Sequence, residues 1–196
     1  AILIQGVDFL RAGSPSAKEL DVLRMMADAV RRVDETVVGT LHSSKPPAVD
    51  LKPQHMSAAI EQALEQVRER LQASRIELSQ QIDPDMPLVM LDAHHMRAAL
   101  AQLLQNAIEA MPDGGELRIG TAVDRDALEV WVSDTGEGIA ASDLSHVFEP
   151  FFSTKSSGSG LGLALVHRIV QEHGGQIDVR SVPELGTTFT LTLPSQ

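Results

Sequence analysis

The spacing of apolar residues predicts helices and strands in separate blocks of the chain. Apolar residues three and four positions apart share one helix face, which predicts helices over 60–71, 94–111 and 161–173. Short apolar stretches, most of them alternating with polar residues, predict strands at 76–82, 117–123, 128–132, 177–179 and 189–193. We therefore predict an α+β fold, a two-layer sandwich in which helices cover one face of a mixed, mostly antiparallel sheet.

Residues 1–44 carry a different pattern, with an apolar stripe on each of two helical stretches joined at Gly13-Ser14-Pro15. These stripes could pack on the rest of the chain, or two copies could pair into a four-helix bundle, and the pattern leaves both open. Lys45-Pro46-Pro47 ends the region because proline lacks an amide proton. The sequence thus predicts a helical hairpin at 1–48 and a second domain at 49–196.

Composition narrows the classes of function. The 196 residues include no cysteine and six aromatic residues, and the formal net charge is −11. Beyond residue 50 there are 10 basic and 20 acidic residues, so we do not expect a nucleic-acid partner. No apolar run reaches the length of a membrane span. We expect a cytoplasmic chain, with any membrane anchor of a longer protein lying outside it.

Three motifs are candidates for chemistry. Asp134-Thr135-Gly136-Glu137-Gly138-Ile139 follows a predicted strand and suits either a surface turn or a carboxylate that accepts from an amine. Gly158-Ser159-Gly160-Leu161-Gly162-Leu163 opens a helix and suits either a flexible linker or a cradle of amides for phosphate. Asn106 lies inside a predicted helix, beside its apolar stripe, and is either a solvated polar residue or a hard ligand for Mg²⁺.

Taken together, these motifs resemble the ATP-binding catalytic domain of a sensor histidine kinase of the GHKL ATPase superfamily. The resemblance rests on an N box around Asn106, two glycine boxes at 134–139 and 158–163, an F box at Phe148–Lys155, and the closing Gly186-Thr187-Thr188-Phe189. It covers about residues 50–196 and implies the GHKL, or Bergerat, fold. Residues 1–44 resemble part of the dimerisation and phosphotransfer hairpin of the same family.

The resemblance implies ATP and Mg²⁺ as cofactors. Asp134 would accept the adenine amino group, Asn106 would hold Mg²⁺, and Lys155 would be a local cation for phosphate. Independently of the resemblance, the stretch 139–160 joins two glycine clusters, is rich in serine and has few apolar residues, so we predict a mobile lid whose order depends on nucleotide. The full set of implied binding residues is Asn106, Glu109, Asp134, Gly136, Gly138, Ile139, Lys155, Ser159, Gly160, Leu161, Gly162, Leu163 and Thr187.

Two departures from the family pattern bear on the reaction. None of the seven histidines lies in the family's phosphoacceptor box, so the resemblance implies that this box lies upstream of Ala1. Gln102 occupies the position where hydrolytic superfamily members carry a glutamate general base, and a glutamine cannot take a proton.

The implied function is transfer of the ATP γ-phosphoryl group to a histidine outside this chain, and then to an aspartate of a response regulator. The hairpin implies a homodimer. The competing classes are a GHKL serine kinase or hydrolytic ATPase, and a nucleotide-sensing scaffold without transfer activity.

Overall fold

The computed structural model describes residues 49–124, 127–155 and 159–195, and the hairpin predicted for 1–48 lies outside them. Three helices are described: α3 (Met56–Ala73), α4 (Ala93–Glu109) and α5 (Gly162–Glu172). The strands are β1 (Lys52–Gln54), β2 (Ile76–Gln81), β3 (Val89–Leu91), β4 (Gly115–Asp124), β5 (Ala127–Asp134), β6 (Gln176–Val182) and β7 (Gly186–Pro194).

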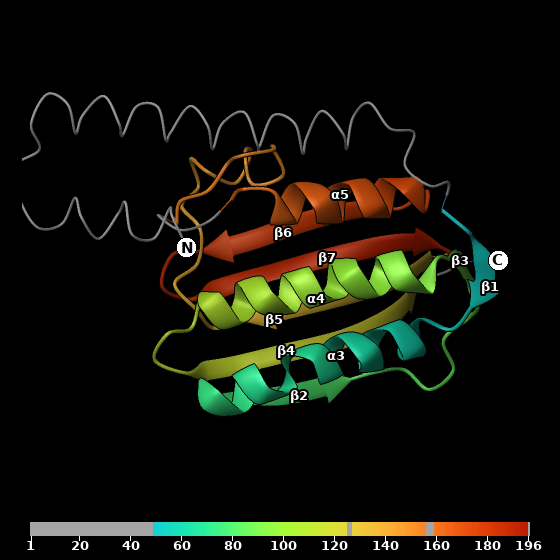
Figure 1. Cartoon of the computed structure of the whole chain (residues 1–196), viewed down its shortest axis with the longest axis horizontal. Helices are drawn as coiled ribbons and strands as arrows, with labels where there is room; N and C mark the ends of the chain where they lie inside the picture. The colour runs from blue at the N-terminus through green and yellow to red at the C-terminus, as the bar shows by residue number, and fades with distance from the viewer. Residues whose placement is uncertain (1–48, 125–126, 156–158, 196) are drawn as a thin grey trace, which may run out of the picture. The chain divides into compact units, whose positions relative to one another are not determined.

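Five strands form one sheet in the order β2-β4-β5-β7-β6, and the three helices lie together on one of its faces (Figure 1). β2 pairs with β4 in parallel, and the other three pairings are antiparallel. This arrangement confirms the predicted two-layer sandwich with a mixed, mostly antiparallel sheet. The sequence pattern missed the short antiparallel pair of β1 and β3.

The core lies between the helices and the inward face of the sheet. Along β5 every second residue is buried, from Leu128 to Asp134, as the predicted alternation requires. In the helix layer, one face of α4 buries Met96, Leu100, Leu103 and Ala107. α4 packs between α3 and α5 and is therefore the central helix of its layer (Figure 1).

Local hydrogen bonds fix where α4 begins and how α5 lies beside it. The Asp92 side chain caps α4 by accepting from the amides of His94 (3.0 Å) and His95 (3.2 Å). The buried His173, just after α5, contacts the Ile169 carbonyl through Nδ1 and accepts from the Asp92 amide at Nε2, 2.9 Å away. Because His173 ties the end of α5 to the start of α4, the two helices run in opposite directions.

None of the described helices has the length and apolar character of a membrane span.

Candidate nucleotide-binding site

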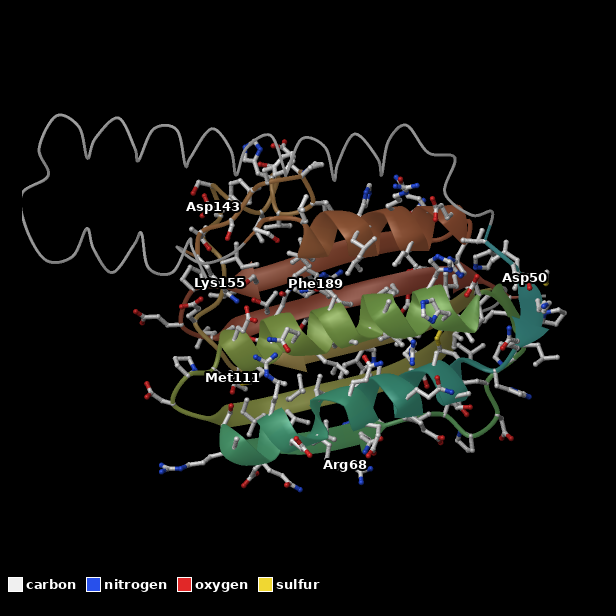
Figure 2. All side chains as sticks on the ribbon, viewed as in Figure 1. Asp50, Arg68, Met111, Asp143, Lys155 and Phe189 are labelled. Atoms are coloured by element: carbon white, nitrogen blue, oxygen red, sulfur yellow. The ribbon has the colours of Figure 1, made fainter. Side chains whose placement is uncertain are left out.

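A cavity of about 360 Å³ lies where α4 ends and α5 begins. Its wall combines Asn106 and Glu109 of α4, Asp134 at the end of β5, and Thr187 of β7. Lys155, labelled in Figure 2, also lines it and lies beside the last turn of α4. The topology therefore brings together residues that are far apart in the sequence.

Asp134 is a buried carboxylate, and only 7% of its surface is exposed. Its Oδ1 accepts from the amides of Gly136 (2.9 Å) and Thr187 (3.2 Å). Oδ2 has no hydrogen-bond partner among the described residues, so it can accept from a ligand in the cavity. Burial raises the pKa of Asp134, and the two amides offset that rise only in part.

Asn106 and Gln102 lie one helical turn apart on α4, and both line the cavity. Gln102 Nε2 donates to Asn106 Oδ1 over 3.0 Å, which orients the Asn106 carboxamide. A carboxamide oxygen has a second lone pair, and Mg²⁺ prefers oxygen ligands. The half-buried Asn106 thus has the chemistry of a magnesium ligand, and its placement favours this over a solvated polar residue.

Lys155 forms an ion pair that the sequence did not predict. Its Nζ lies 2.9 Å from Glu109 Oε2, and Gln105 Nε2 donates to the other Glu109 oxygen over 2.6 Å. Burial opposes the charge of Glu109, but these two hydrogen bonds outweigh burial and lower its pKa. Lys155 is therefore paired across the cavity mouth rather than a free cation on a loop.

The two glycine boxes allow close approach between segments around the cavity. Gly138 has a φ of +68°, and a Cβ there would lie 2.2 Å from the carbonyl oxygen of Val182. Gly162 begins α5, and a Cβ there would lie 2.6 Å from Gln102 Nε2. A side chain at position 138 would separate two backbone segments beside the cavity, whereas one at position 162 would displace the Gln102 side chain.

Most of the residues that the resemblance implied lie in this cavity. Those that line it are Asn106, Glu109, Asp134, Gly138, Ile139, Lys155, Ser159, Gly160, Gly162, Leu163 and Thr187. Gly136 lies behind Asp134 and donates its amide to it, and Leu161 is the residue before α5, so neither lines the cavity. The lid predicted for 139–160 falls partly outside the described residues and stays a prediction.

Part of the apolar wall was not among the implied site residues. It includes Val147, Phe152 and Phe189. Val147 is buried, and the neighbouring Phe148 stacks on His167 of α5 (5.4 Å between ring centroids). The alternation in β7 marked Phe189 as a core residue, but nothing local in the sequence indicates that it reaches a cavity.

The fold and this cavity define a class of ATPase domain. Residues 91–196 match the model of the family described as "Histidine kinase-, DNA gyrase B-, and HSP90-like ATPase". The chain belongs to this family.

Individual relatives are sensor histidine kinases. The chain is 34% identical to sensor histidine kinase ZraS of Escherichia coli K12 over 171 residues, which are 87% of this chain and 37% of ZraS. It is 31% identical to the histidine-protein kinase AtoS of the same organism, covering 96% of this chain and 31% of AtoS. The chain therefore spans about a third of the length of these relatives.

Solved histidine kinase structures share the fold. A solved structure of the mycobacterial sensor histidine kinase MprB is 32% identical, with a TM-score of 0.67, and the match covers 74% of this chain and 98% of the solved chain. Histidine kinase ThkA in complex with response regulator protein TrrA has a TM-score of 0.72 at 23% identity, covering all of this chain and 57% of the solved ThkA chain. At that identity the second likeness shows the fold alone.

Proposed function

We propose that this chain is the ATP-binding catalytic region of a sensor histidine kinase. In this proposal it binds ATP with Mg²⁺ and transfers the γ-phosphoryl group to a histidine outside residues 1–196. The phosphoryl group then passes to an aspartate of a response regulator. The observation that carries the proposal is Asp134, whose Oδ1 is held by two backbone amides while Oδ2 stays available to the cavity.

Asp134 suits recognition of an exocyclic amine. A buried carboxylate that already accepts two amides is fixed in position, so its remaining oxygen can accept from the adenine amino group without reorganisation. The apolar wall of Val147, Phe152 and Phe189 is suited to the flat faces of a purine.

The other end of the cavity suits phosphate. Mg²⁺, held by Asn106 Oδ1, would neutralise charge on the triphosphate. The backbone amides of Gly160, Gly162 and Leu163 lie at the start of α5, where a helix favours anions. Lys155 could exchange its partner Glu109 for a phosphate oxygen.

Gln102 favours transfer to an acceptor over hydrolysis. It lines the cavity within hydrogen-bond distance of Asn106, where a general base for water would need a carboxylate. Phosphoryl transfer requires positioning and neutralisation of charge more than covalent help, and these residues supply both. The likeness to sensor histidine kinases such as ZraS, at 34% identity, is the support for a response regulator as the partner. The hairpin predicted at 1–48 supports a homodimer.

The test combines binding and transfer. Calorimetry should show Mg²⁺-dependent binding of ADP to the chain. With labelled ATP, the chain alone should gain no acid-labile phosphate, whereas a separately supplied phosphotransfer hairpin that contains the acceptor histidine should become labelled. Steady release of phosphate without that hairpin would instead indicate a hydrolytic ATPase. Binding without transfer would indicate a nucleotide-sensing scaffold.

A further inference from the structure

The hydroxyl group of Ser181 connects two parts of the cavity wall, Ile139 of the first glycine box and Thr187 of β7. Ser181 lies on β6, opposite Thr187 of β7 in the strand register. Its Oγ donates to the Gly186 carbonyl (2.9 Å), accepts from the Ile139 amide (2.8 Å), and lies 2.9 Å from Thr187 Oγ1. A serine hydroxyl has one hydrogen and two lone pairs, so these three bonds use it completely.

This arrangement fixes the polarity of the Thr187 hydroxyl. A carbonyl can only accept, so the single hydrogen of Ser181 goes to Gly186. The contact between Ser181 and Thr187 then requires Thr187 to be the donor. The hydroxyl hydrogen of Thr187 is therefore already donated to Ser181, so Thr187 Oγ1 can only accept a hydrogen bond from a ligand. Thr187 is buried and lines the cavity with Asp134.

The polarity of Thr187 matters because Asp134 alone does not fully select adenine. The carboxylate accepts from the amino group of adenine, but it could equally accept from the N1–H of hypoxanthine. Hypoxanthine would then place a carbonyl where adenine has its amino group, and that carbonyl needs a donor. A Thr187 that can only accept leaves the carbonyl unpaired in a buried site.

We propose that Ser181 is a positioning residue for purine specificity: by holding Thr187 as an acceptor, it makes the cavity prefer a 6-amino purine over a 6-oxo purine. This inference rests on the proposed nucleotide function and adds a determinant of the substrate class. Ser181 itself does not line the cavity and acts through Thr187.

Ser181 also has a structural role, which the test must separate. Its bond to the Ile139 amide anchors the chain where it leaves the first glycine box. Losing that anchor should weaken all nucleotides by a similar factor, because it does not distinguish an amino group from a carbonyl. Only a change that lets Thr187 donate a hydrogen bond should alter the ratio of affinities for a 6-amino and a 6-oxo purine nucleotide.

The experiment compares Mg-ADP and Mg-IDP by calorimetry, since the two ligands differ only at this edge of the base. In Ser181→Ala, the Thr187 hydroxyl can rotate and donate, so the preference for ADP over IDP should fall about tenfold. Ser181→Thr keeps the hydroxyl and should keep the wild-type ratio. Ser133→Ala is the matched control, because Ser133 pairs with Thr188 through hydroxyls 2.8 Å apart and neither lines the cavity.

The outcomes distinguish a role of Ser181 in purine specificity from a purely structural role. Equal losses of ADP and IDP affinity in Ser181→Ala would overturn the specificity role and leave the proposed function standing. A wild-type chain that binds neither nucleotide would overturn both. Thr187→Val tests the same step without touching β6, whether or not Ser181→Ala folds. Valine has no hydroxyl to donate, so the carbonyl of IDP stays unpaired as in the wild type and the ratio should stay near the wild-type value. A ratio that falls in Thr187→Val would overturn the inference.

Discussion

Replacing Asp134 by asparagine separates the role of this carboxylate in binding from its cost to the fold. Asparagine Oδ1 can accept from the amides of Gly136 and Thr187 just as the carboxylate Oδ1 does, at 2.9 and 3.2 Å. The asparagine Nδ2 then takes the place of Oδ2. The group available to the ligand therefore changes from an acceptor to a donor, while the surrounding bonds remain.

The expected loss of affinity follows from that change. A hydrogen bond to a charged group contributes about 1.5–3 kcal/mol, and two donors facing each other in a buried site cost about 1–3 kcal/mol more. Together these effects amount to about 2.5–6 kcal/mol, which is roughly a 10²- to 10⁴-fold weaker affinity for ADP.

The effect on stability should have the opposite sign. Burial raises the pKa of Asp134 above its ordinary value of 3.8, so the folded chain favours the neutral carboxyl group more than the unfolded chain does. This preference stabilises the fold below the unfolded-state pKa and is lost as the pH rises through the folded-state pKa. Each pKa unit of the rise corresponds to about 1.4 kcal/mol. Because Asp134→Asn is neutral throughout, its Tm at pH 7 should equal or exceed that of the wild type.

Calorimetry with Mg-ADP and thermal unfolding at pH 7 and at pH 4 test both parts. The Tm advantage of Asp134→Asn should shrink at the lower pH, where the wild-type carboxyl group gains its proton. Glu137→Gln is the control, since Glu137 is an exposed carboxylate that lines the same cavity, and it should bind ADP within about threefold of the wild type. Near-normal ADP affinity in Asp134→Asn would refute the assignment of Asp134 to the adenine amino group.

Three further changes test other parts of the molecule. Lys155→Ala should weaken Mg-ATP analogue binding about three- to tenfold by calorimetry, whereas Glu109→Gln, which frees the lysine, should not; equal losses would exclude a phosphate role. Gly120→Ala should lower the Tm by several degrees, because its Cβ would lie 2.1 Å from the Trp131 ring; an unchanged Tm would contradict this close packing. Its ADP affinity should be unchanged, since strand alternation places both residues on the sheet face away from the helices. Hydrogen exchange across 139–155, a region of successive turns, should slow with a Mg-ATP analogue more than exchange in β5, and equal protection with and without the analogue would count against a lid.

The elements that could be predicted are those whose own residues determine them. The apolar stripe of α4 and the alternation of β5 and β7 are long enough to distinguish a period of 3.6 from one of 2. β1 and β3 have three residues each, too few to show a period. They exist because tertiary contacts bring Lys52 opposite Leu91, and local sequence does not encode that pairing.

Some residues of the candidate site could likewise be predicted from the sequence, and others could not. Its glycines and isolated polar residues could be identified because such residues destabilise regular secondary structure unless they serve another role, as with Asn106 inside a helix. The pairing of Lys155 with Glu109 joins residues 46 positions apart, and the apolar wall uses residues whose type suits any core. Neither carries a local signal. The role of the Ser181 hydroxyl could not be predicted either, because a serine in a strand is ordinary and only its three hydrogen-bond partners indicate a role.

The charge of the domain explains why the site takes this form. Among the described residues that line the cavity, Lys155 is the only basic side chain, and it is already paired with an acid. Beyond residue 50 the chain carries twice as many acidic as basic residues, so its overall field repels a polyanion. Under the proposed function, affinity for ATP would then come from oriented neutral groups, namely the amides at the start of α5, and from a metal ion that Asn106 would hold. The cavity thus depends on close approach between backbone segments at Gly138, and of the Gly162 backbone to the Gln102 side chain, rather than on a cluster of cations.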